Sequence, residues 1–227
     1  MDVSERNRNN VLIRWNRKHK ADVDYIKNQE NRFSDLKSRI CAFLAGDGNI
    51  LSDNGLTCRH NTIRFFPDHI SLVKSFEEAL LKVYNKRPKI IKKNNYFFIT
   101  LDSKPVVLDL LSYCNFGKMN WKIPSFVFNS TKNKIEWLRA FFDCEAYVHK
   151  NYISVKSVNQ KGMNQIRDLL EEFDITSKIY SYKPKNNNWN INYMLRILKK
   201  KDREYYARLI GFNHSIKFKK LNKSLNY

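Results

Sequence analysis

Two nonapeptides at matching places decide the fold of this chain: ICAFLAGDG at residues 40–48 and LRAFFDCEA at residues 138–146. Each closes an apolar segment with helical spacing. Each also carries an acid, Asp47 or Glu145, next to small residues at the helix end. One such ending is common, but two of them in one chain call for a comparison of the segments around them.

The elements around the nonapeptides recur in the same order, which indicates an internal repeat. Asp47 and Glu145 lie 98 residues apart, and the strand residues Ile63 and Phe65 match Ile153 and Val155 at an offset of 90. Both copies are expected to run helix, strand pair, helix, strand pair, helix. The expected helices are 32–46, 72–84, 106–113, 132–144, 163–173 and 203–210, and the expected strands include 61–66, 96–101, 145–148, 152–157, 178–182 and 189–198.

This repeat predicts an α+β fold with two pseudo-symmetric halves. Each half is an antiparallel sheet backed by helices on one face, and the two halves pack through the helices that carry the nonapeptides. The other sheet face is half-polar by alternation and is left open to a partner. We place a basic extension over residues 1–30, the first repeat over 31–125, and the second repeat with a basic tail over 126–227.

At this point the chain resembles the LAGLIDADG homing endonucleases in their single-chain, two-repeat form, the archaeal or intron-encoded type. The eighth position of that family's nonapeptide holds the catalytic carboxylate, which here falls on Asp47 and Glu145. The segment YFFITLDSKPVVLDLL and the ending REYYARLIGFNHSIKFKKL also resemble the family, so the likeness covers residues 32–222. The chain departs from the pattern at Ala45, where Asp is usual, and at Ala146, where Gly is usual.

Composition indicates a polyanionic partner. The 42 Lys and Arg residues against 22 Asp and Glu give a net charge of +20 and a pI near 9.8. Apolar residues make up 42% of the chain, enough for a folded core, and no run of eighteen apolar residues suggests a membrane span. The polar start and four cysteines without framework spacing lead us to expect a cytoplasmic, nucleoid-associated protein with free thiols.

The paired acids predict a divalent metal centre. Two carboxylates at the ends of closely packed helices repel each other unless a cation lies between them, and oxygen ligands with room for water and phosphate favour Mg²⁺, with Mn²⁺ as a substitute. Ala42, Ala45 and Ala140 are the small residues expected to allow that packing. The resemblance implies a metal held by Asp47, Glu145, Gly46 and Cys144, and it implies Lys104 as a catalytic lysine near the scissile phosphates.

The open sheet faces are the expected DNA surface, because a two-stranded β-ribbon fits the major groove. Polar side chains suited to base edges occur along both pairs of strands. In the first half they are Asn49, Ser52, Asn54, Arg59, His60 and Arg64, and in the second half His149, Asn151, Ser154, Lys156, Asn190, Asn192 and Arg196. The expected phosphate contacts are Lys92, Lys93, Lys183 and Lys185.

These observations predict a monomeric, Mg²⁺-dependent endonuclease that makes a double-strand break at a long, non-palindromic site in double-stranded DNA. We recognise no flanking self-splicing segments, so a free-standing or intron-encoded protein is expected. The main alternative is a catalytically silent protein of the same fold, acting as a maturase on intron RNA or as a DNA-binding regulator. A third alternative is a nucleic-acid coat protein, which has no need for paired acids.

Overall fold

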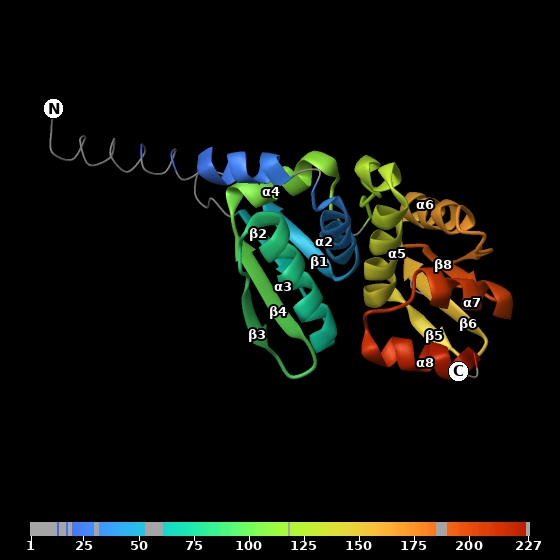
Figure 1. Ribbon diagram of the computed structural model, residues 1–227. Helices are drawn as coiled ribbons and strands as arrows, with labels where there is room; N and C mark the ends of the chain where they lie inside the picture. Colours follow the sequence, from blue (N-terminus) through green and yellow to red (C-terminus); the bar gives the residue numbers. More distant parts are fainter. Residues whose placement is uncertain are drawn as a thin grey trace, which may run out of the picture.

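The computed structural model describes residues 20–29, 32–52, 61–117, 119–184 and 190–225, together with Ile13 and Arg17. Two α+β halves lie side by side (Figure 1). The first contains α2 (Ser34–Asp47), β1 (Gly48–Ser52), β2 (Asn61–Phe65), α3 (Ile70–Tyr84), β3 (Lys89–Lys92), β4 (Phe97–Asp102) and α4 (Lys104–Tyr113). The second contains α5 (Thr131–Glu145), β5 (Tyr147–His149), β6 (Tyr152–Ser157), α6 (Gln160–Glu171), β7 (Lys178–Tyr182), β8 (Asn192–Ile197), α7 (Lys200–Leu209) and α8 (Ser215–Leu225). A short 3-10 helix, η1 (Ser125–Asn129), lies in the connection between the halves.

The two sheets have the same topology. Their strand orders are β1-β2-β4-β3 and β5-β6-β8-β7, with every neighbouring pair antiparallel. Asn49 pairs with Arg64 in the first sheet, and Tyr147 pairs with Ser154 in the second. These pairs are related by the offsets of 98 and 90 that the sequence showed. The expected fold class, with two pseudo-symmetric repeats, is confirmed.

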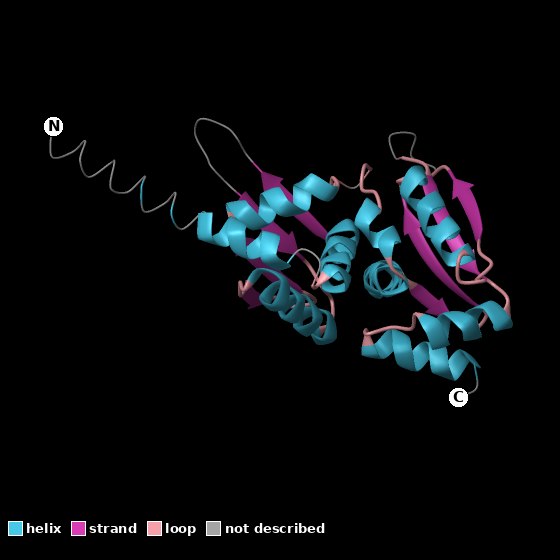
Figure 2. Cartoon of the chain, turned by 45° about the horizontal axis from the view of Figure 1, so that its top comes forward, coloured by secondary structure: helices cyan, strands magenta, loops and turns pink. Residues whose placement is uncertain are grey.

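Helices α2 and α5 pack against each other between the two sheets, as both Figure 1 and Figure 2 show. Ala42 and Ala140 are buried, as expected, and the two helices also approach closely at Gly46. A Cβ atom at Gly46 would lie 2.7 Å from the Cβ of Cys144, closer than side chains can pack. Only glycine therefore lets the two helix ends meet at this point.

Each half has an aromatic core beneath its sheet. In the first half, the Phe43 ring centroid lies 5.0 Å from that of Phe65 and 5.9 Å from that of Phe76. In the second half, Trp121 from the connecting segment packs on Phe141, with ring centroids 4.9 Å apart. These buried rings fix the spacing between each sheet and the central helix pair, because core packing tolerates little change in volume.

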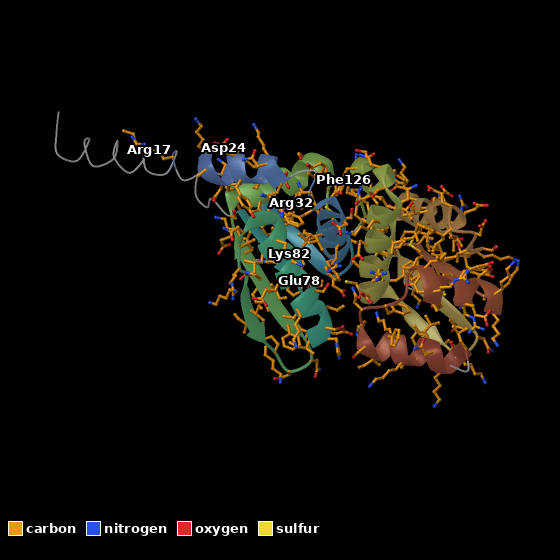
Figure 3. All side chains as sticks on the ribbon, viewed as in Figure 1. Arg17, Asp24, Arg32, Glu78, Lys82 and Phe126 are labelled. Atoms are coloured by element: carbon orange, nitrogen blue, oxygen red, sulfur yellow. The ribbon has the colours of Figure 1, made fainter. Side chains whose placement is uncertain are left out.

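Helix α3 shows how the pattern of apolar residues fixes an element. Its apolar side chains are buried on one face, while Glu78 and Lys82 lie on its exposed face (Figure 3) and form an ion pair of 2.6 Å one turn apart. The left-handed backbone at Asn85 ends the helix. Helix α3 therefore covers the first sheet with its apolar side only.

Strands β1 and β3 and helix α8 had no residue range among the expected elements. The strand β3 lies in a Lys- and Asn-rich stretch with little alternation, and α8 lies in the basic tail. The described part of the N-terminal extension, residues 20–29, is helical and packs on the first half through buried Ile26 and an ion pair of 2.8 Å between Asp22 and Lys86. None of the helices in the described ranges is both long and apolar enough to cross a membrane.

Candidate active site and nucleic-acid interface

The two predicted acids lie at the ends of the two central helices, which contact each other there. Asp47 is the last residue of α2, and Glu145 is the last residue of α5. The backbone of Gly46 lies against Cys144, and a Cβ built on Gly46 would be 3.6 Å from the Cγ of Glu145. The Cys144 thiol donates a hydrogen bond to the Asp47 carboxylate. The structure thus brings together the four residues that the sequence assigned to a metal.

Burial raises the pKa of Asp47 above its usual value, and the nearby Asp68 carboxylate raises it further. Lys217 and the Cys144 thiol act in the opposite direction and lower the pKa of Asp47. Burial prevails because water is removed from the charged form of the carboxylate. A cation bound at this point would restore the ionised form.

An anchor between two helix ends, which the sequence did not indicate, lies next to the acids. The Asp143 carboxylate accepts hydrogen bonds from the backbone N–H groups of Asn213, at 3.0 and 3.2 Å, and His214, at 2.9 Å, just before α8 begins. In return, Lys217 Nζ in the first turn of α8 donates to the carbonyl oxygens of Asp143 (2.6 Å), Cys144 (2.8 Å) and Phe142 (3.4 Å) at the end of α5. The N-terminal end of α8 thus lies beside a carboxylate, which the helix dipole favours, and the C-terminal end of α5 receives a cationic donor for its free carbonyl groups.

These two buried groups have shifted pKa values. Burial raises the pKa of Asp143 to about 6, although the two backbone donors and the charges of Lys217 and His214 oppose it. Burial also lowers the pKa of Lys217, which the surrounding acids counter. The sequence offered no signal for Lys217, because its position depends on how the C-terminal segment folds back onto α5.

The loop before α3 joins the same cluster. His214 Nε2 lies 3.3 Å from the Asp68 carboxylate, and the rings of His214 and His69 stack with centroids 4.7 Å apart. The hydrogen bond from His214 lowers the pKa of Asp68, while burial and the neighbouring His214 lower that of His69. The C-terminal segment is therefore fastened to the first half as well as to α5.

A cleft of about 530 Å³ opens beside Glu145. Its lining includes Gly46 and Glu145 from the two helix ends, Asn49 from the first sheet and Lys156 from the second, and Trp121 from the connecting segment. The cleft is large enough to admit a hydrated cation or a phosphate group. Both sheets and both helix ends therefore contribute to one concave site.

The donors at this site suit a hard divalent cation. In the described part of the chain, no group of three or more His, Cys, Asp or Glu side chains could hold a metal by itself. Two carboxylates with two backbone carbonyls leave coordination positions for water and phosphate, and Mg²⁺ usually keeps several waters and binds one or two carboxylates. The residues therefore fit a cation that binds together with nucleic acid.

The open face of the first sheet follows from its register. Ile63 and Leu101 are buried under the helices, so the neighbouring positions Arg64 and Thr100 lie on the opposite, open face, with Asn49 beside Arg64. The Oδ1 of Asn49 and the Nε of Arg64 are both buried without a hydrogen-bond partner. Two adjacent polar atoms without partners indicate a place for a polar ligand.

Other predicted residues of the first half are placed differently. By the same alternation, Ser52 and Lys92 lie on the face that the helices cover, and Lys93 lies in the β3–β4 hairpin. The register also puts Lys104 at the end of the sheet remote from Asp47, because Gly48 is level with Phe65 whereas Ser103 bonds to Asn61. The structure does not bring Lys104 to the acids. The remaining candidates fall outside the described residues: Asn54, Arg59 and His60.

The second sheet presents most of its predicted residues on its open face. Its buried residues Ile153, Val155, Leu195 and Ile197 define the covered face. The predicted residues on the open face are His149, Ser154, Lys156, Asn192 and Arg196. Asn151 lies in the turn after β5, Lys183 follows β7, Asn190 precedes β8, and Lys185 lies outside the described residues.

Tyrosines on this open face escaped the sequence prediction. Tyr147, Tyr180 and Tyr182 are exposed, and the Arg196 guanidinium lies 4.8 Å from the ring centre of Tyr152 and 5.5 Å from that of Tyr180. The alternation of Tyr180 and Tyr182 in one strand was the available signal. Aromatic rings beside cations provide stacking surfaces for bases.

Comparisons with known proteins agree with this architecture. The family model of the LAGLIDADG-like domain matches residues 132–211. A glutamine–fructose-6-phosphate aminotransferase of Methanocaldococcus jannaschii is 27% identical over 195 residues, which are 83% of this chain but only 17% of that protein. The chain thus spans a small part of that relative, whose named activity belongs to the whole protein.

Solved structures show the same fold. The crystal structure of I-DmoI in complex with DNA and Mn has a TM-score of 0.62 at 12% identity, covering 79% of this chain and 97% of that chain. The N-terminal LAGLIDADG domain of DUF199/WhiA has a TM-score of 0.53 at 16% identity, covering 79% of this chain and 83% of that domain. With its two repeats and paired central helices, the chain has the two-repeat LAGLIDADG fold in a single chain, and residues 132–211 match the LAGLIDADG-like domain.

Proposed function

We propose that this protein is a site-specific endonuclease that hydrolyses phosphodiester bonds in double-stranded DNA with a divalent cation, Mg²⁺ or Mn²⁺. The observation that carries the proposal is the position of Asp47 and Glu145 as the last residues of two helices that are in contact at Gly46. A protein that only binds nucleic acid gains nothing from two carboxylates placed where phosphates would lie, because they repel the ligand.

The candidate ligands for the metal are the carboxylates of Asp47 and Glu145 and the carbonyl groups of Gly46 and Cys144. Bound there, a divalent cation activates water and stabilises the leaving oxygen of an in-line displacement. Two further residues line the cleft beside this centre. Lys156 lines the cleft, where its ammonium group would hold a phosphate, and the indole of Trp121 lines the same cleft.

The two open sheet faces would bind the DNA on either side of this centre. In the first half, Asn49 and Arg64 each have a buried polar atom without a hydrogen-bond partner. In the second half, Lys156 and Arg196 supply cationic groups and Asn192 supplies an amide. Since the two faces differ in sequence, the target is expected to be long and non-palindromic. Both acids come from one chain, so a monomer suffices. I-DmoI, which has the same fold, is described in complex with DNA and Mn and with DNA and Ca.

A cleavage selection tests the proposal. The wild type is incubated with a randomised double-stranded DNA library and Mg²⁺, next to Asp47→Asn, Glu145→Gln and the control Glu171→Gln, whose exposed carboxylate ends α6. We expect cuts at one shared long site for the wild type and the control, and a loss of at least about 100-fold in both site variants, since each removes a carboxylate charge from the proposed catalytic centre. Equal cutting by all four proteins, or no cutting by the wild type with any divalent cation, would refute the proposal.

The second candidate function is binding without cleavage, as a maturase on intron RNA or as a DNA-binding regulator. The exposed tyrosines around Arg196 favour it, because unpaired bases stack on aromatic rings. The same library would then yield salt-sensitive binding without cuts. A preference for structured RNA over duplex DNA in a competition assay would identify the maturase.

A further inference from the structure

The metal centre consists of two halves that the pseudo-twofold relation should make equivalent. One half joins the Asp47 carboxylate to the carbonyl end of α5, and the other joins the Glu145 carboxylate to the carbonyl end of α2. The flanking loops also correspond, since Pro67–His69 before α3 and Ser157–Asn159 before α6 are related by the same offset of 90. A symmetric pair of sites would surround each carboxylate in the same way.

The surroundings of the two carboxylates differ. Beside Glu145 the space is a cleft of about 530 Å³, lined by Gly46, Ser157 and Val158. Beside Asp47 the chain's own C-terminal segment lies in the corresponding place. There His214 bonds to Asp68, the counterpart of Val158, and Lys217 reaches the end of α5.

The ammonium of Lys217 is bound as a cation would be. It lies 2.8 Å from the carbonyl oxygen of Cys144 and 2.6 Å from that of Asp143, and its charge acts on the Asp47 carboxylate. The Cys144 carbonyl belongs to the ligand set expected for a metal. Its acceptor position is already taken by a positive charge, which would repel a divalent ion placed beside it.

The placement of Lys217 is fixed from several sides. The Asp143 carboxylate holds the backbone of residues 213 and 214 immediately before α8, and the stacked rings of His69 and His214 hold the same segment against the first half. The lysine also satisfies carbonyls that the last turn of α5 would leave without a partner. A lysine held by so many contacts is not readily displaced by a hydrated ion.

We propose that the Lys217 ammonium takes the place of the divalent cation in the Asp47 half of the centre, so that the protein binds a single divalent cation, on the Glu145 side. The inference rests on the proposed function and deepens it. The two DNA strands are then cleaved at different rates. The strand that faces the Glu145 half is cut first, and a nicked duplex precedes the double-strand break.

The count of bound cations tests this without any DNA cleavage. Mn²⁺ is titrated into the full chain, and free Mn²⁺ is measured by electron paramagnetic resonance. We expect one bound Mn²⁺ in the wild type, two in Lys217→Met, and one again in Lys217→Met combined with Asp47→Asn. Lys217→Arg keeps a cation in place and should bind one. Lys219→Met, an exposed lysine on the same helix, is the matched control and should also bind one.

Two variants keep the test decisive if Lys217→Met folds poorly. With Lys217 intact, Glu145→Gln should abolish Mn²⁺ binding, whereas Asp47→Asn should retain it. Two Mn²⁺ in the wild type, none in the wild type, or equal losses in Glu145→Gln and Asp47→Asn would each overturn the inference. A wild type that binds one Mn²⁺ on the Glu145 side but cuts no library DNA refutes the endonuclease and leaves the inference on the cation count standing.

Discussion

The contact between the two central helices predicts that an alanine at position 46 destabilises the protein, whereas helix propensity alone predicts that it stabilises the helix. Gly46 lies in the last turn of α2, where replacing glycine by alanine normally stabilises a helix by up to about 1 kcal/mol. Here the new Cβ would lie 2.7 Å from the Cβ of Cys144 and 3.3 Å from its Sγ. Carbon atoms pack at about 3.5–4.0 Å, so the helix ends must separate by about 1 Å. We expect Gly46→Ala to lower the free energy of unfolding by about 1–3 kcal/mol, the usual cost of overpacking.

The clash has one partner, so it should be relieved from the other side. Cys144→Gly removes both atoms that the new methyl group would strike. In urea unfolding of the wild type, both single variants and the double variant, we expect a favourable coupling energy of at least about 1 kcal/mol. Gly117→Ala is the control, since a Cβ there meets nothing within 4 Å. Additive effects within about 0.5 kcal/mol, or a stabilised Gly46→Ala, would contradict the packing described for the helix ends.

Three further predictions concern stability and binding. Burial raises the pKa of Asp143 from its usual value of 3.8 to about 6, so the contribution of Asp143 to stability is complete below about pH 4 and is lost as the pH rises through 6. The difference in unfolding free energy between the wild type and Asp143→Asn should therefore change by about 3 kcal/mol across that window. A constant difference would show the pKa assignment to be wrong. Gly162→Ala should lower the melting temperature through a cost of about 1–3 kcal/mol, because its Cβ would lie 2.4 Å from the Trp121 ring, and Trp121→Phe should recover part of the loss in the same calorimetric scan. Arg64→Ala should weaken duplex DNA binding by about 1–3 kcal/mol in fluorescence anisotropy, while Lys82→Ala on the far, exposed face of α3 should leave it within about twofold, and equal effects would remove Arg64 from the interface.

The two repeats were readable from the sequence because the signals that specify them are local. The apolar spacing before Asp47 and Glu145 marks the central helices, and the alternation in Ile63/Phe65 and Ile153/Val155 marks the strands. An acid at the end of each helix follows directly in the chain, so its place in the fold comes with the helix. The +20 charge and the paired acids then indicated nucleic acid and metal.

Assignments that depended on register were less accurate. Whether a strand residue faces the helices or the open side changes with a shift of one position. Ser52 was therefore grouped with Asn49 and Arg64 as a base contact, although the register puts it on the covered face, and the register puts Lys92, expected to contact phosphate, on that face as well. The proximity of Lys104 to the acids was inferred from the family resemblance, but β4, the strand that leads to Lys104 at the start of α4, runs away from Asp47.

The sequence by itself determined the two helix–strand repeats, the acids that close the central helices and the basic character of the chain, because each depends on neighbours a few residues away. Only the tertiary structure decided that Gly46 lies against Cys144 with no room for a Cβ atom, that Lys217 occupies the carbonyl end of α5, and that a cleft opens beside Glu145. Lys217 lies 72 residues after Glu145 in the chain, and no local pattern links them. Their meeting depends on the return of the C-terminal segment to the helix pair, held there by the hydrogen bonds of Asp143 and the packing of α8.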